Sequence, residues 1–296
     1  MSNPVFDRLN KDLDRGYAGF GRGPQAPTAP QYGQPGYPSA PQYGQHGPQD
    51  TMSQRSMEDM YAGPSAGPVQ TGRLTVDDVI MKFAGLFTLL LVAAGATGFL
   101  LPVRTAATLI LPVILITLAL GLFIAFKKSV SVPLIVAYAV LEGVLVGGVS
   151  LVYGNVFGNN VVTTAVIATL SVFVGMFVGW KTGVIRVTDK SRRIFGMAIL
   201  GYLIFALANF VAAWLFRAND GWGFFGFGSG LSILVSVFAV GLASYSLAMD
   251  FDSIDRAVAA QVPQKYSWLL AHGVIVTVVW LYLELLRLIA QLSGRE

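Results

Sequence analysis

Seven long apolar stretches occupy the chain from residue 79 onward, and polar or turn-forming residues separate them. They lie near 79–101, 105–126, 130–153, 161–180, 194–216, 228–250 and 267–291. Each has about the twenty residues that an α-helix needs to cross roughly 30 Å of hydrocarbon at 1.5 Å per residue. Backbone groups in lipid must be satisfied internally, and these runs are too long and continuous for barrel strands. The pattern therefore predicts an all-α fold, a polytopic membrane bundle of seven transmembrane helices.

The breaks between the stretches carry turn or charge signals. They are Pro102, Lys127-Lys128, Gly154-Asn155, the 181–193 run, Asn219-Asp220-Gly221 and Pro263. Just before the first stretch, Thr75 is followed by Asp77 and Asp78. A hydroxyl at the N-cap with acids in the first turn is typical of a capping box, so we expect ordered structure to begin at Thr75.

The residues before this cap belong to a different physical class. Residues 1–78 contain ten of the fourteen prolines and eight of the sixteen acids, and Pro30-Gln31-Tyr32-Gly33-Gln34 recurs at 41–45. Such a Pro/Gly/Gln/Tyr-rich stretch cannot bury enough apolar surface to offset chain entropy. We interpret residues 1–73 as a disordered tail and residues 74–293 as the transmembrane domain. A solvated tether is favoured over a docking arm for the tail.

Composition and charge agree with a membrane protein and fix its orientation. Hydrophobic residues make up 54% of the chain and charged residues only 12%, against about a quarter in soluble domains. The net charge of +4 would suggest nucleic acid, but its location indicates otherwise. The loops after spans 2, 4 and 6 hold nine Lys and Arg, and those after spans 1, 3 and 5 hold two. The positive-inside rule therefore predicts a cytoplasmic N-terminus, with the lipid bilayer and no nucleic acid as partner.

Ionisable side chains inside the spans are few, and each is costly if it faces lipid. The candidates for function are Glu142 in span 3, Asp250, Asp252 and Asp255 at the end of span 6, and Glu284 and Arg287 in span 7. An ion or proton site is favoured for Glu142 over a simple hydrogen bond to a neighbouring helix. The i,i+3 spacing of Glu284 and Arg287 favours a pair that could simply neutralise the acid. Three acids at the negative end of a helix dipole suggest a cation or a basic partner.

Enzymatic signatures are weak or missing from the sequence. The chain has no cysteine and two histidines, and it contains no HExxH motif. Ser150 and His272 are too little to indicate a serine protease, and His272 is better interpreted as a packed histidine. A retinal pump also has seven helices, but span 7 lacks the lysine for a Schiff base. We expect neither an enzyme nor a resident cofactor.

The acidic segments resemble a known family. They are Met249-Asp250-Phe251-Asp252-Ser253-Ile254-Asp255, Leu281-Tyr282-Leu283-Glu284 with Leu285-Leu286-Arg287, and Leu141-Glu142-Gly143. Together with seven spans, they resemble the Bax-inhibitor (YccA-like) membrane family over about residues 74–293. The resemblance implies a seven-helix protein of a bacterial plasma membrane, with the last helix surrounded by the other six. It implies a pH-sensitive calcium leak channel or, as in other bacterial relatives, a protein that binds and modulates a membrane protease.

The resemblance also implies a pH sensor made of one acid on span 6 and one on span 7, which share a proton. These positions correspond to Asp250 and Glu284, although similar proteins often carry Asp at the second. Two close carboxylates in a low dielectric cannot both ionise cheaply, and their oxygens suit calcium as a transported ion. Similar proteins latch the span 6 acid with an arginine on span 2. Span 2 here has none, and Lys127 is the nearest substitute.

The depth of the two acids tests this assignment. Asp250 and Glu284 are 34 residues apart, and the turn signal at Pro263-Gln264-Lys265 is centred on 264. In straight antiparallel helices this leaves Glu284 about six residues, or about 9 Å, out of level with Asp250. An irregular connection over 256–266 could absorb the offset.

The expected function is a cation (calcium) leak channel gated by carboxylates on spans 6 and 7. The alternative is an interaction protein that modulates a membrane protease or a stress response without transport. An uncoupled leak and a coupled cation/proton exchanger fit the sequence equally.

Overall fold

The structure is a computed structural model that describes residues 72–215 and 230–294, so most of the predicted tail and the turn at Asn219-Asp220-Gly221 lie outside the described residues. Within these ranges the chain forms helices and no strand of a sheet. They are α3 (Val76–Leu100), α4 (Val103–Phe126), α5 (Val132–Phe157), α6 (Asn159–Lys181), α7 (Asp189–Leu215), α8 (Gly230–Ala259), the 3-10 turn η4 (Gln264–Tyr266) and α9 (Ser267–Ser293). All seven α-helices are long and apolar enough to span a membrane. The predicted all-α fold is confirmed for the described residues.

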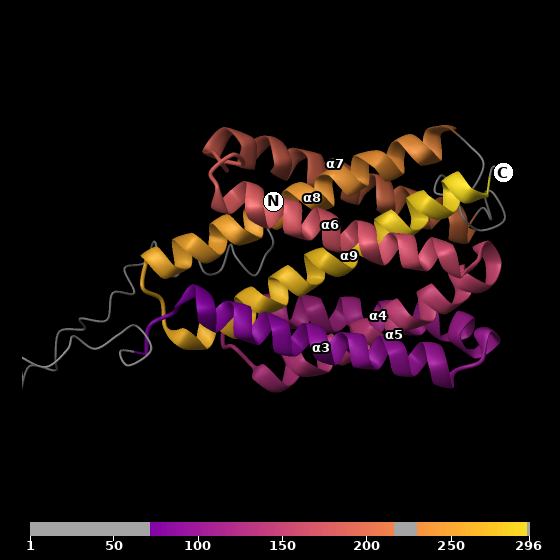
Figure 1. Cartoon of the computed structure of the whole chain (residues 1–296), viewed down its shortest axis with the longest axis horizontal. Coiled ribbons are helices and arrows are strands. Elements are labelled where there is room, and N and C mark those ends of the chain that lie inside the picture. The colour runs from indigo at the N-terminus through magenta and orange to yellow at the C-terminus, as the bar shows by residue number, and fades with distance from the viewer. Residues whose placement is uncertain (1–71, 216–229, 295–296) are drawn as a thin grey trace, which may run out of the picture.

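The last helix, α9, forms the centre of the bundle. In Figure 1 it runs obliquely between a group made of α3, α4 and α5 and a group made of α6, α7 and α8. In its most apolar 18-residue stretch about 83% of the residues are buried, against 17 to 50% in the corresponding stretches of the other spans. Helices α3, α5, α6 and α8 pack directly on α9, while α4 packs mainly on α5 and α7 on α8. The expected surround of six helices is therefore an inner ring of four with two helices farther out.

Side-chain caps start the first and fifth spans. Thr75 caps α3 as predicted, because its hydroxyl accepts from the Asp78 amide at 3.1 Å and the Asp78 carboxylate accepts from the Thr75 amide at 3.0 Å. A second reciprocal pair joins Thr188 and Ser191 over 2.9 and 3.1 Å. Helix α7 therefore begins at Asp189, five residues before the predicted 194. The cap provides hydrogen-bond acceptors for the first amides of the helix, so the helix can begin in a polar segment that hydropathy does not identify.

Two further predicted boundaries are wrong. Gly154-Asn155 was predicted as a break, but α5 continues through it to Phe157, and the chain reverses at Gly158 with φ of +93°. A Cβ on Gly154 would lie 2.8 Å from the Asn159 side chain, so this glycine makes room for the start of α6. Gly154 therefore marks a close approach of α5 to the start of α6 and not a turn of the chain.

The end of α8 is the second correction. The apolar run ends at Asp250, but the helix continues to Ala259. Phe251, Ile254 and Ala257 are buried at a spacing of three residues, which keeps one face of the extension packed after the continuous apolar run has ended. Asp250, Asp252 and Asp255 therefore lie inside a helix and not at its end.

Backbone hydrogen bonds join the start of α3 to the turn between α8 and α9. Arg73 forms a β-bridge with Pro263, the Leu74 amide donates to the Val262 carbonyl at 2.9 Å, and the Gln264 amide donates to the Gly72 carbonyl at 2.9 Å. The Gln264 side chain also donates to Asp78 at 2.7 Å. The start of α3 and the turn that precedes α9 are thus held together as one structural unit.

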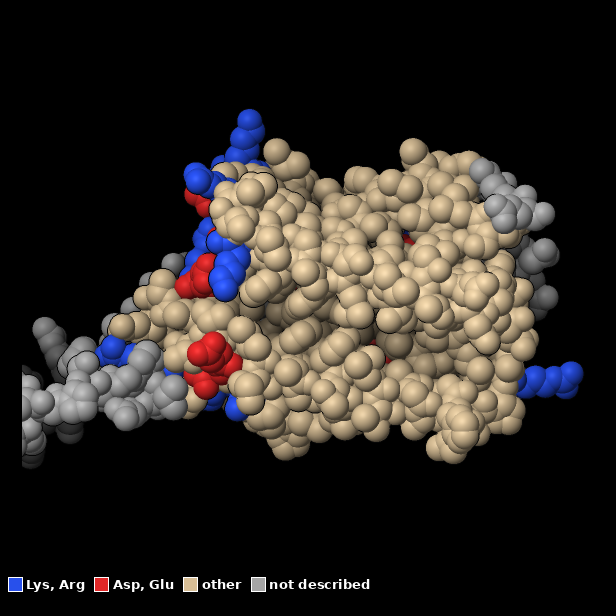
Figure 2. Space-filling model, viewed as in Figure 1, with Lys and Arg blue, Asp and Glu red and all other residues tan. Residues whose placement is uncertain are grey.

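Charged residues gather at the end of the bundle where α3 begins. Figure 2 shows most of the Lys, Arg, Asp and Glu atoms there, with uncharged atoms over the middle of the molecule. The connections at this end run from α4 to α5, from α6 to α7 and from α8 to α9. They are the basic loops of the sequence, and we refer to this end as the basic end.

The contact between α3 and α5 yields a stability prediction. A Cβ on Gly147 of α5 would overlap the Ala94 carbonyl of α3, whereas a Cβ on Gly85 of α3 has no neighbour within 4 Å. We expect Gly147→Ala to lower the free energy of unfolding by about 1–3 kcal/mol through overpacking, and Gly85→Ala to cause no loss. Denaturation in detergent micelles measures both, and equal effects would contradict this packing.

Candidate functional site

Helix α9 carries a series of buried polar side chains through the middle of the bundle. They are Ser267, His272, Thr277, Glu284 and Gln291, each at most 6% exposed. A polar group at this depth needs a partner within the protein, because hydrocarbon offers none. Except for the Ser267 hydroxyl, which has no hydrogen-bond partner among the described residues, these side chains contact α5, α7 or α8. The contacts divide the candidate acids into separate environments.

Asp250 on α8 is the most enclosed of the candidate acids, with 1% of its surface exposed. Its Oδ2 lies 2.6 Å from the Thr277 hydroxyl of α9. The same hydroxyl lies 3.2 Å from the Gly273 carbonyl. Both contacts of this hydroxyl are made at the interface of α8 and α9, near the basic end.

Glu284 lies farther along α9 in a different cluster. Its carboxylate accepts from the Tyr202 hydroxyl of α7 at 2.5 Å and lies 3.3 Å from the indole Nε1 of Trp280. It also forms an ion pair with Arg287, as their spacing predicts. Arg287 Nε in turn donates to Ser236 of α8 at 3.1 Å. Glu284 therefore has a basic partner and two neutral donors.

The register of α8 against α9 sets the depth of each acid. Asp250 meets Thr277, and Ser236, fourteen residues earlier, meets Gln291, fourteen residues later, at 3.0 Å. Glu284 is seven residues, or about 10 Å, beyond the level of Asp250. The offset calculated from the turn at 264 is confirmed, and the 256–266 connection does not remove it. Among the described contacts, Asp250 and Glu284 have separate partners and share no hydrogen bond.

Glu142 of α5 is 7% exposed and accepts a hydrogen bond from Tyr138, one turn earlier on the same helix. The edge of the Tyr138 ring meets His272, with centroids 4.4 Å apart and planes at 87°. His272 is 2% exposed, which agrees with its interpretation as a packed histidine. Glu142, Tyr138 and His272 thus form a third cluster between α5 and α9.

The other acids of α8 face a different environment. Asp252 pairs with Arg192 of α7 at 2.5 Å and with Arg256 at 2.9 Å, so the basic partner expected for this group of acids is present for Asp252. Asp255 is exposed. Asp252 therefore ties α7 to α8 near the basic end.

Lys127, the substitute for the latch, lies at the end of α4. Its ammonium is 5.8 Å from the centroid of the Phe123 ring, and it lines a small pocket with Tyr266 and Leu269. These positions place it near the start of α9. Its role as a latch for Asp250 stays a prediction.

The arrangement supports proton or cation chemistry more than tight metal binding. Among the described residues, no group of three or more His, Asp and Glu is placed to hold a metal ion. Asp250 and Glu284 instead lie singly, at different depths. Sequence reasoning missed Thr277 and Tyr202, which contact Asp250 and Glu284, and Ser236, which contacts Arg287, because a hydroxyl inside a span has no distinctive pattern. Tyr138 and Trp280 could have been found, since each lies four residues before an acid.

Comparison with known proteins identifies the class of the chain. The model of a family described as Bax inhibitor 1 like matches residues 3–294. A search of curated proteins finds no match to the chain. The family match covers both the seven spans and all the acidic segments that carried the resemblance.

The pair of Glu284 and Arg287 yields a prediction on stability. Their side chains are 7% and 14% exposed, so Arg287→Met leaves a buried carboxylate without its basic partner. We expect this variant to lose about 3 kcal/mol of unfolding free energy at neutral pH. Combining it with Glu284→Gln should restore part of the loss, as measured by denaturation in detergent.

Arg256→Met is the matched control for this cycle, because its side chain is 43% exposed and Asp252 keeps Arg192. We expect a cost below about 1 kcal/mol for it. Additive losses in the Glu284 and Arg287 double variant would show that the two side chains are not coupled.

Proposed function

Because the chain belongs to the Bax inhibitor 1 like family, we propose that it is a pH-sensitive cation leak channel, with calcium as the ion, gated by Asp250 of α8 and Glu284 of α9. The observation that carries the proposal is the contact of Asp250 with Thr277. It buries a carboxyl group at the interface of two membrane-spanning helices with a neutral hydroxyl as its partner. We further propose that the membrane is a bacterial plasma membrane, with the basic end in the cytoplasm.

Counting protons at this contact explains how it can respond to pH. The Thr277 hydroxyl has one proton and two acceptors in reach, Asp250 Oδ2 and the Gly273 carbonyl. If the proton goes to Gly273, Asp250 must donate its own proton, so both bonds form only with a neutral acid. Loss of that proton leaves one bond and an unpaired negative charge between α8 and α9.

An unpaired charge at this depth is costly, and water or a cation would relieve that cost. A hard cation such as calcium is suited to carboxylate oxygens. Deprotonation of Asp250 therefore favours separation of α8 from α9 and entry of a cation from the basic end. Glu284, which keeps Arg287 beside it, forms the second acidic position on the path.

The two acids act in this proposal as separate sites and not as a pair that shares one proton. Asp250 responds to protons, because its partner is neutral. Glu284 holds α7 to α9 through the hydrogen bond from Tyr202. Asp250 lies at the level of Thr277 and Glu284 lies seven residues farther along α9, so a cation would pass the two acids one after the other.

Calcium flux into liposomes that contain the full chain tests this mechanism. We expect flux to rise several-fold with pH, because the ionised acid admits cations. Asn at position 250 resembles the neutral acid, so Asp250→Asn should hold flux at its low-pH level across the range. Glu284→Gln should lower flux at every pH and leave the pH dependence in place.

Asp255→Asn is the matched control, since Asp255 is an exposed acid on the same helix. It should retain both the flux and its pH dependence. If Asp250→Asn keeps the wild-type pH profile, or if Asp255→Asn removes it, Asp250 is not the sensor. Absence of calcium flux from the wild-type chain at every pH would overturn the channel itself.

A further inference from the structure

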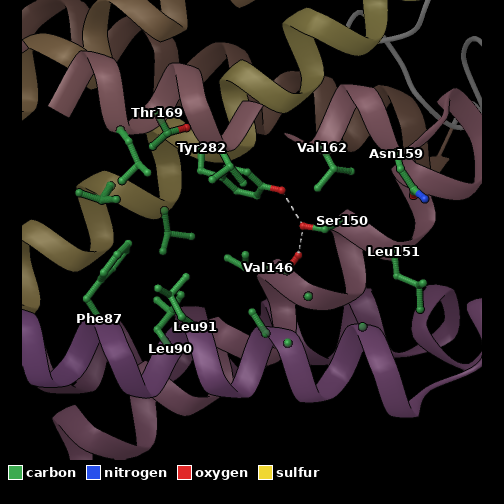
Figure 3. A pocket seen from close by; sticks show the side chains of 18 residues that line it. Phe87, Leu90, Leu91, Val146, Ser150, Leu151, Asn159, Val162, Thr169 and Tyr282 are labelled. Carbon is green, nitrogen blue, oxygen red and sulfur yellow. Dashed lines mark hydrogen bonds between the residues drawn. The ribbon is translucent and has the colours of Figure 1, made fainter. Parts of the chain in front are cut away.

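A cavity of about 380 Å³ lies between α3, α5, α6 and α9. Its wall is almost wholly apolar, with Leu91 from α3 (Figure 3), Val166 and Leu170 from α6, and Val278 from α9. This volume is within the range of ligand-binding pockets. None of the five candidate acids lines it, and neither Arg287 nor Lys127 does, so the proposed channel does not account for it.

Three aromatic rings close the inner end of the cavity. Phe87 lines it and stacks on Phe83, with ring centroids 5.5 Å apart, and Phe83 stacks on Phe173 of α6 at 5.5 Å. A second apolar cavity of about 310 Å³ lies on the far side of Phe83 and Phe173, nearer the basic end. The rings therefore bridge α3 and α6 and divide the space between these helices.

The length of the cavity matches one leaflet of a bilayer. Its wall follows α3 from Phe87 to Gly98, eleven residues or about 16 Å. Half of a hydrocarbon core of roughly 30 Å is about 15 Å. Gly98 is near the end of α3, and Asn159, which also lines the cavity, is the first residue of α6. The cavity thus extends from the middle of the membrane to the surface opposite the basic end.

The cavity is open toward the surroundings of the spans. The rim residues Leu91, Val166 and Leu170 are 52%, 43% and 45% exposed, and each belongs to a membrane-spanning helix. The medium in contact with such side chains is hydrocarbon. Gly95 and Gly98 contribute no side chain, and a Cβ on either would have no neighbour within 4 Å. Free space therefore continues from the bilayer into the cavity along α3.

Polar atoms in the cavity are already satisfied except near its outer end. Ser150 donates to the Val146 carbonyl at 2.5 Å and lies 2.6 Å from the Tyr282 hydroxyl (Figure 3), so an apolar occupant leaves neither hydroxyl unpaired. Asn159, by contrast, places an amide side chain at the outer end. This depth is where the ester groups of a phospholipid meet its hydrocarbon chains.

We propose that this cavity binds one acyl chain of a glycerophospholipid from the leaflet opposite the basic end, with the ester near Asn159 and the terminal methyl near Phe87. The chain would contact Val278, Val279 and Tyr282, the part of α9 between Thr277 and Glu284. The bound lipid is therefore a structural neighbour of both acidic positions. The binding site itself does not depend on the proposed transport.

A photoreactive phospholipid tests the proposal directly. The full chain is placed in vesicles of phosphatidylethanolamine and phosphatidylglycerol with a trace of phosphatidylcholine that carries a diazirine near the end of one acyl chain. After illumination, mass spectrometry of peptides locates the label. We expect it to concentrate on the segments around Phe87 and Val279 and to exceed several-fold that on Leu115, an exposed residue of α4.

Two substitutions fill the cavity from opposite walls. Gly95→Phe should reduce this labelling at least fivefold, while Gly85→Phe, on the same helix but outside the cavity, should leave it unchanged. Val166→Trp from α6 should repeat the loss, with the exposed neighbour Ile167→Trp as its control.

Labelling spread evenly over α3 and α4, or unchanged in both filled variants, would overturn the proposal. If one filled variant fails to fold, the other decides. The channel proposal has an independent readout, because labelling is measured without calcium, and a chain that conducts no calcium can still show or lack the site.

Discussion

Membrane hydrocarbon offers polar groups no hydrogen bonds, and the arrangement of the bundle follows from that constraint. A helix with as many polar side chains as α9 can only stand where protein surrounds it. The inner ring of α3, α5, α6 and α8 provides the enclosure, and α4 and α7 lie farther from α9, packed mainly on α5 and α8. The position of α9 at the centre is therefore required by its own sequence. Asp250, Glu284 and Glu142 follow as a consequence, since their contacts lead to this helix, whereas Asp252 pairs with arginines of α7 and α8.

The antiparallel register of α8 and α9 decides which acids can meet. It aligns Asp250 with Thr277 and Ser236 with Gln291, and it brings Ala243 to the level of Glu284. Ala243 has no polar atom on its side chain, so Glu284 takes its inter-helix partner from α7 through Tyr202. A shift of two helical turns would be needed to bring the two acids together. The chain thus has two acidic positions with different neighbours, one facing a hydroxyl and the other an arginine.

Much of this architecture was predictable because few solutions exist in a membrane. Length and hydropathy determine the spans, and a turn centred on 264 predicted that Glu284 lies about six residues beyond the level of Asp250, close to the seven observed. The Glu284 and Arg287 pair followed from helix geometry alone. The identity of Thr277 and Tyr202 as partners was not predictable, because hydroxyls inside spans often bond only to their own helix. The extension of α8 was missed for a related reason, since Phe251 and Ile254 hold it by packing and not by an apolar run.

The bridge between Arg73 and Pro263 has a mechanical consequence. The chain enters the first span by way of hydrogen bonds to the same turn that joins α8 to α9, and Gln264 fastens that turn to the cap of α3. A force applied at Gly72 is therefore transmitted directly to the turn between α8 and α9, as well as along α3. The segment Gly72–Leu74 is thus bonded to the turn that connects the two helices of the Asp250 contact, α8 and α9.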